Sequence, residues 1–118
     1  MNNQKLESSM KSIHSETVKL NEVIPFEWDS LYTFKPYESR ENIEEVIGFK
    51  SAYIEENNIN EGMVYLLFVK DEKVICNVVG YSQDLGYDID FVSEVAFAED
   101  AEFDVIKTED VTTLTYIK

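Results

Sequence analysis

Residues 63–82, "MVYLLFVKDEKVICNVVGYS", contain the pattern that decides the fold. The run 63–70 is almost continuously apolar and rich in strand-forming residues, and a second such run spans 74–82. Only "DEK" separates the two runs, and so short a connection predicts an antiparallel hairpin. Because the first run carries apolar side chains at consecutive positions, we expect it to be a central strand covered on both faces.

The stretch before this hairpin predicts a short amphipathic helix over about 40–47. Ser39 can cap its N-terminus, and Gly48 suits its end because the left-handed conformation costs glycine little. The expected apolar stripe of this helix consists of Ile43, Val46 and Ile47. We therefore expect the helix to pack on one face of the sheet.

Residues 26–37, "FEWDSLYTFKPY", predict a strand over 28–34. Alternate side chains of a strand point to opposite faces, so Trp28, Tyr32 and Phe34 would share one face and form core under the helix. Tyr37 follows Pro36, and we expect it either at the surface or at the entry to the helix.

The remaining segments complete an α+β fold. Residues 83–90 read as a turn about Gly86, 91–98 as a strand, and 101–107 with 111–118 as a last hairpin. The expected architecture is one antiparallel meandering β-sheet of about five strands within a single domain, residues 25–118. Residues 1–24 form a polar N-terminal segment or tether, in which Leu6, Met10 and Ile13 have helical spacing.

The residue types that usually carry out catalysis are scarce. His14 is the single histidine and lies in the polar N-terminal segment, while the single cysteine, Cys76, lies in an apolar run. One histidine and one cysteine do not form a tetrahedral zinc site, and no glycine-rich loop opens a helix to hold phosphate. We therefore expect no enzymatic activity and no cofactor. Weaker alternatives are a carboxylate-dependent hydrolase and a calcium site at Asp84, Asp88 and Asp90.

Charge is the strongest functional signal. The chain has 24 acidic residues against 10 basic ones, a net charge of −14. Nucleic acids and anionic membranes bind through lysine and arginine, so this balance disfavours both and favours a basic protein partner. Between Asp84 and Asp110 there are ten acids and one base, Lys107. Alternation would place acids of this region on one sheet face, either as a functional negative surface or as an edge kept soluble by charge.

These observations predict a non-catalytic acidic binding protein, most specifically an immunity or inhibitor protein that neutralises a basic toxin or nuclease. The candidate partner-binding residues are Tyr37, Asp84, Tyr87, Asp88, Asp90, Glu99, Asp100, Glu102 and Asp104. The oligomeric state is left open.

The segments "FEWDSLYTFKPYESRENIEEVIGFKS" and "NEGMVYLLFVKDEKVICNVVGYSQDLGYDIDF" together resemble a group of small uncharacterised bacterial proteins, many from Bacillus-type organisms and many described as lipoproteins. The shared pattern is a WDxxYxFxPY segment and a GMxxLLFVK hairpin. The resemblance implies a polar N-terminal tether after a lipidated cysteine, and hence an extracytoplasmic lipoprotein domain of structural or ligand-binding role. The chain as given has no apolar run of membrane-spanning length and no apolar signal core, so we expect it to be cytoplasmic unless a signal peptide was removed.

Overall fold

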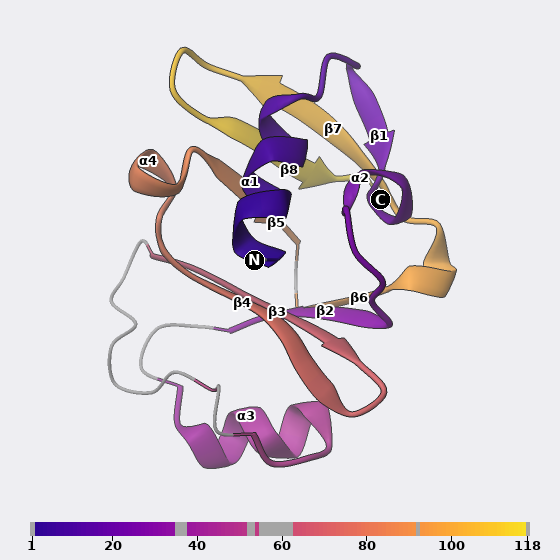
Figure 1. Ribbon diagram of the computed structural model, residues 1–118, viewed down its shortest axis with the longest axis vertical. Coiled ribbons are helices and arrows are strands. Elements are labelled where there is room, and N and C mark those ends of the chain that lie inside the picture. The colour runs from indigo at the N-terminus through magenta and orange to yellow at the C-terminus, as the bar shows by residue number, and fades with distance from the viewer. Residues whose placement is uncertain (1, 35–37, 52–53, 55–62, 92, 118) are drawn as a thin grey trace.

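The computed structural model describes residues 2–34, 38–51, 54, 63–91 and 93–117. Within these residues the fold is α+β, with two four-stranded sheets. Figure 1 shows the two sheets one above the other, with α3 below the lower sheet. The elements are α1 (Asn2–Lys11), β1 (Thr17–Lys19), α2 (Leu20–Val23), β2 (Ser30–Thr33), α3 (Arg40–Ile47), β3 (Met63–Lys70), β4 (Lys73–Tyr81), α4 (Ser82–Leu85), β5 (Tyr87–Asp90), β6 (Glu94–Ala96), the 3-10 helix η1 (Phe97–Glu99), β7 (Glu102–Lys107) and β8 (Thr112–Tyr116).

The lower sheet, sheet B, is antiparallel in the order β4-β3-β2-β6. It confirms the hairpin predicted from residues 63–82, because β3 and β4 pair along their length. Leu66 and Phe68 face the core between the two sheets, while Tyr65 and Leu67 face α3, and all four are buried. The expectation of a central strand covered on both faces is therefore confirmed.

The side chain of Asp29, the residue just before β2, holds the turn of this hairpin. Asp71 and Glu72 have φ values of 51° and 61°, the pair of left-handed residues that a tight hairpin turn of the type I′ family requires. The Asp29 carboxylate accepts a hydrogen bond from the Asp71 backbone N–H at 2.9 Å and lies 3.8 Å from the Lys70 ammonium. The role of the aspartate beside the only tryptophan is thus to hold the β3–β4 turn.

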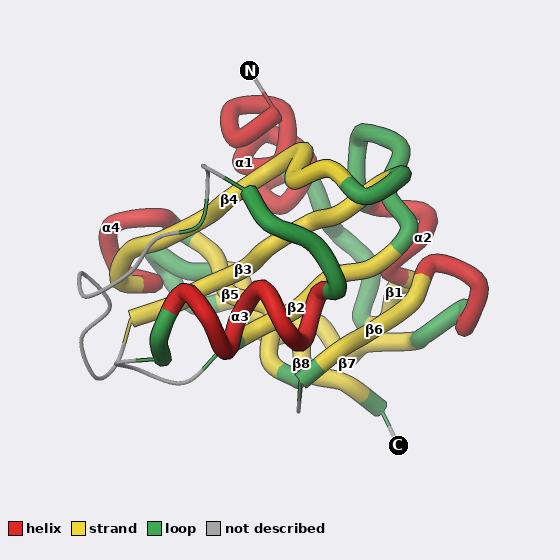
Figure 2. The backbone as a smooth tube through the Cα atoms, turned by 90° about the horizontal axis from the view of Figure 1, so that it is seen from below, coloured by secondary structure: helices red, strands yellow, loops and turns green. Residues whose placement is uncertain are grey.

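The predicted helix is confirmed as α3, which lies across sheet B (Figure 2). Ser39 Oγ accepts a hydrogen bond from the Asn42 N–H, and Gly48 ends the helix at φ 88°. Ile43 and Ile47 are buried against the sheet. Val46 was expected in the same apolar stripe but is 57% exposed, because the two isoleucines occupy the side that faces the sheet.

The expected arrangement of Trp28 is wrong. Trp28 lies in the core between the sheets, where it makes an edge contact with Phe68, whereas Tyr32 lies on the opposite side of sheet B, in the cluster under α3. The regular strand begins only at Ser30, after a bend at Asp29. Because the backbone changes direction there, the alternation of faces does not extend back to the tryptophan.

The upper sheet, sheet A, has the order β1-β7-β8-β5. The predicted last hairpin is confirmed as β7 and β8. The prediction of one meandering sheet is wrong, because β1 joins from the N-terminal segment and β5 pairs with β8 in parallel. Residues 83–90, expected to be a turn, instead contain most of α4 and all of β5.

The N-terminal segment is part of the folded core. Figure 1 shows α1 beside both sheets, and Leu6 and Met10 are 0% exposed there. Ile13, Leu20 and Ile24 join the same cluster. Residues 2–24 therefore supply five core side chains and an edge strand, which differs from the expected tether.

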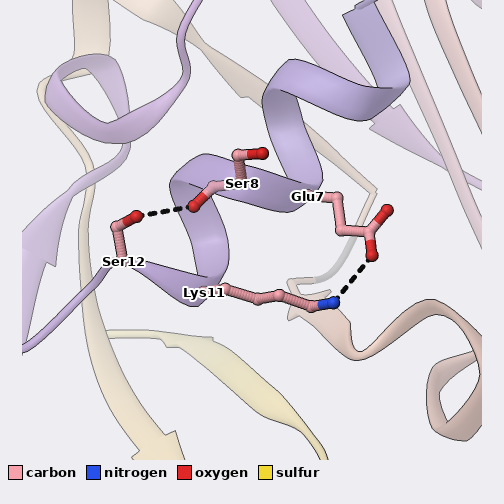
Figure 3. Close-up of polar contacts among 4 residues, drawn as sticks. All are labelled: Glu7, Ser8, Lys11 and Ser12. Atoms are coloured by element: carbon pink, nitrogen blue, oxygen red, sulfur yellow. Dashed lines mark hydrogen bonds and ion pairs between the residues drawn. The ribbon is translucent and has the colours of Figure 1, made fainter.

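The exposed side of α1 carries polar contacts between residues one turn apart (Figure 3). The Lys11 ammonium lies 2.7 Å from the Glu7 carboxylate one turn earlier, and the Ser12 hydroxyl donates to the Ser8 carbonyl at 2.7 Å. Such exposed pairs contribute little stability, so the buried leucine and methionine hold this helix in place.

Candidate functional site

Sheet A has two faces of opposite character. Ile89, Phe103 and Leu114 point into the core and are buried. The residues that alternate with them along each strand point outward. We call the outward surface of sheet A the acidic face. It consists of Thr17, Lys19, Asp88, Asp90, Glu102, Asp104, Ile106, Thr113, Thr115 and Ile117.

The strand register arranges this face in rows across the sheet. In the middle row, Asp90 of β5 lies beside Thr115 of β8, which lies beside Asp104 of β7. Thr17 of β1 ends this row next to Asp104. Thr115 therefore has a carboxylate on each side, one from β5 and one from β7.

A second row has the same order of strands. Asp88 lies beside Thr113, which lies beside Ile106. In the third row, Glu102 lies beside Lys19 on one side, and on the other it accepts a hydrogen bond through its carbonyl from the Ile117 N–H at 3.0 Å. Ile117 thus extends the pairing of β8 by one residue.

The result is two columns of carboxylates separated by a column of threonines. Asp88 and Asp90 form the column on β5, and Glu102 and Asp104 form the column on β7. Two strand spacings separate the columns by about 10 Å. The four like charges repel one another along each strand and across β8, which is unfavourable for folding.

Few cations offset this repulsion. Lys19 is the one basic residue on this face among the described residues. The two ion pairs found between described residues, Glu7–Lys11 and Asp29–Lys70, both lie elsewhere. Asp90, Glu102 and Asp104 are exposed, so the face is open to a partner.

Asp88 differs from the other three acids because it is partly buried. Burial raises the pKa of its carboxyl above the usual range, and the negative charge of Asp90 raises this pKa further. A hydrogen bond from the Ile89 backbone acts in the opposite direction. The charged form of Asp88 is therefore held in an environment that disfavours it.

Four of the nine predicted site residues, Asp88, Asp90, Glu102 and Asp104, come together on the acidic face. Tyr87 does not, because it is 2% exposed and its side chain lies in the core. It alternates with Asp88 along β5, so burial of one follows from exposure of the other. Burial also raises the pKa of the Tyr87 hydroxyl. Tyr37 lies outside the described residues.

The other predicted acids have separate local settings. Asp84 is exposed on α4, where it lines a shallow open cavity of about 540 Å³ together with Lys11 and Asp110. The Glu99 carboxylate accepts a hydrogen bond from the Ala96 N–H at 3.1 Å. The Asp100 carboxylate accepts one from the Asn21 amide. Glu99 thus closes η1 on itself and Asp100 ties the end of η1 to α2, and neither extends the acidic face.

Sequence reasoning missed the uncharged residues of the acidic face, the threonines between the two acid columns and an isoleucine on β7. Thr113 and Thr115 are partly exposed, and Ile106 is 54% exposed. The period-two pattern of "EFDVIK" and "VTTLTYIK" could have predicted these residues, because it puts Ile106 on the same side as Glu102 and Asp104.

Neither a metal-binding cluster nor a membrane-spanning helix is found among the described residues. Asp84, Asp88 and Asp90 do not converge, and the described part of the chain contains no group of three or more histidine, cysteine or acidic residues that could hold a metal ion. No helix in that part has the length and apolar character that a membrane crossing requires.

Comparisons with protein-family models, with curated proteins and with solved structures give no match to this chain. The chemistry of the acidic face is therefore the basis for a function. Its carboxylates and threonine hydroxyls can accept hydrogen bonds and pair with cations. The candidate catalytic residue types lie elsewhere, since Cys76 is buried in the core and His14 lies in the loop between α1 and β1.

Proposed function

We propose that the protein is a non-catalytic binding protein that holds a basic partner protein against the acidic face, as an immunity or inhibitor protein does. The observation that carries the proposal is the gathering of Asp88, Asp90, Glu102 and Asp104 on one open sheet face that has a single cation, Lys19, among the described residues. Arginine and lysine side chains of a partner would relieve the repulsion between these carboxylates.

The partner's chemistry follows from the sign and size of the charge. A net charge of −14 attracts basic proteins and repels nucleic acids, so it speeds encounters with the former. A toxin or nuclease that acts on nucleic acid has a basic site of its own. Covering such a site with the acidic face would block it without any catalytic step.

The setting of Asp88 favours a binding role over solubility alone. A carboxylate that only keeps a surface soluble is best placed where water can solvate it fully. Asp88 is instead partly buried beside a second acid, which opposes its ionisation. Residues that lower stability in this way are common at sites selected for binding.

The test is an affinity capture from a lysate of the source organism with three forms of the protein. One form is unchanged, the second carries Glu102→Gln with Asp104→Asn, and the third carries Glu41→Gln with Glu45→Gln on the exposed side of α3. The last two variants change the net charge equally. We expect one basic protein to bind the first and third forms, to be lost from the second, and to elute as salt rises.

Two results would contradict the proposal. Equal loss from both variants would show that total charge, not the acidic face, drives capture. Retention of the same protein by the acidic-face variant at every salt concentration would place the interface elsewhere.

A further inference from the structure

Two exposed isoleucines interrupt the acidic face. Five large hydrophobic side chains among the described residues are exposed: Val46, Tyr81, Phe97, Ile106 and Ile117. Ile106 is 54% exposed and Ile117 37% exposed, and both belong to the acidic face. An exposed apolar residue is common by itself, but here two occupy positions between carboxylates and threonines.

The register places Ile106 close to both acid columns. It follows Asp104 by two positions on β7, a distance of about 7 Å along a strand. Across the sheet it lies beside Thr113, and Asp88 lies on the far side of that threonine. The Ile106 side chain is therefore an apolar projection flanked by carboxylates in two directions.

Ile117 stands at the other end of the face. It continues β8 beyond Thr115 and lies beside Glu102, whereas Ile106 lies beside Thr113. The row that joins Asp90 and Asp104 separates the two isoleucines. Ile106 is the better exposed of the two, and it shares β7 with Asp104 and a row with Asp88.

Exposed ion pairs alone rarely hold a complex. Pairs between solvated charges contribute little, and they affect association rate and orientation more than affinity. Most of the affinity of an interface comes from a few apolar or aromatic contacts that exclude water. On the acidic face, Ile106 is the more exposed of the two side chains that can supply such a contact next to the charges.

We propose that Ile106 is the apolar anchor of the acidic face and that the partner places an apolar side chain, flanked by basic residues, against it. This inference rests on the proposed function and adds the apolar element of the partner's binding segment. The carboxylates would steer and orient the segment, and the contact with Ile106 would slow its dissociation.

The test uses two peptides of equal charge, Arg-Arg-Leu-Arg-Arg and Arg-Arg-Ser-Arg-Arg, titrated at low salt and followed by NMR chemical shifts. We expect the leucine peptide to bind the unchanged protein about 15-fold more tightly, as burial of about two methylene groups would give. Ile106→Thr should abolish this advantage, and Val46→Thr on α3 should preserve it. Threonine is chosen because it keeps the β-branched shape that suits a strand.

The outcomes separate the inference from the proposed function. If both peptides bind with equal affinity and lose it with salt and with Glu102→Gln, the apolar anchor is wrong and the charge-based function stands. If the leucine advantage survives Ile106→Thr, the anchor lies elsewhere and the inference is also wrong. If neither peptide binds the unchanged protein, the inference and the proposed function both fail.

Discussion

The two sheets of this protein use the same strand geometry in opposite ways. Sheet B is apolar on both faces, since α3 covers one and sheet A with α1 covers the other. Sheet A is apolar on its inner face and acidic on its outer face. The difference indicates which residues the fold requires: both faces of sheet B are committed to the core, while the outer face of sheet A is free to carry a binding surface.

The largest expected effect tests the first half of this comparison. Phe68 is 0% exposed at the centre of sheet B and makes edge contacts with Phe26 and Trp28. Phe68→Ala should lower the free energy of unfolding by about 3–5 kcal/mol, measured by denaturant titration. Asp104→Asn on the acidic face should change it by about 0.5 kcal/mol or less. Similar losses from the two changes would remove the distinction between the sheets.

The next prediction concerns what joins the sheets. Leu6 of α1 is 0% exposed in the core between them, so Leu6→Ala should cost about 2–5 kcal/mol of unfolding free energy. Lys5→Ala, one residue earlier at an exposed position, is the matched control and should have little effect. An unchanged melt of Leu6→Ala would mean that the N-terminal segment is a tether after all.

A smaller and opposite effect is expected at the turn of sheet B. Glu72 has φ 61°, a conformation that strains a residue with a Cβ atom and suits glycine. Glu72→Gly should therefore raise the unfolding free energy by about 0.5–1 kcal/mol, since aspartate followed by glycine is a preferred pair for this turn. Glu72→Gln removes the same charge but keeps the Cβ atom. Equal gains from both variants would assign the effect to charge.

The smallest expected effect is a pH-dependent change in stability that arises from the acidic face of sheet A and not from sheet B. Because the pKa of Asp88 is raised in the folded state, folding favours its protonated form, and its ionisation at higher pH destabilises the protein. Asp88→Asn should thus stabilise by about 0.5 kcal/mol at pH 7. This gain should vanish as pH falls through about 4, where an unfolded aspartate also takes up a proton.

Thermal melts of Asp88→Asn and the unchanged protein across pH 3–8 would measure this difference. Glu41→Gln, at an exposed position on α3, serves as the control for a change of total charge. A loss of stability at pH 7 in Asp88→Asn would show that the fold needs this carboxylate. The outer face of sheet A would then not be free of a role in stability, in contrast to what we propose.

Local signals predicted the local elements well. The β3–β4 hairpin and α3 follow from apolar runs, a serine cap and a terminal glycine, all close together in the sequence. The division into two sheets does not, because β1 pairs with β7 and β5 pairs with β8 across long stretches of chain. β5 was also not predicted because it is short: a run of four residues after a glycine fits a turn as well as a strand.

The candidate site was predicted in part for the same reason. Alternation along β7 was enough to place Glu102 and Asp104 on one face. The same alternation applied to "YDID" would have predicted that Tyr87 is buried in the core once Asp88 was assigned to the surface. That the acids of β5 and β7 share a face depends on β8 lying between them, which no local pattern reveals.

The pairing of Val18 with Phe103 also bears on how the protein is made. The β3–β4 hairpin can close as soon as its own residues have left the ribosome, but β1 must wait until β7 has been synthesised. β5 must wait in the same way for β8. The carboxylates of the acidic face can therefore take up their final positions only after β7 and β8 have been synthesised, and an unfinished chain lacks this surface.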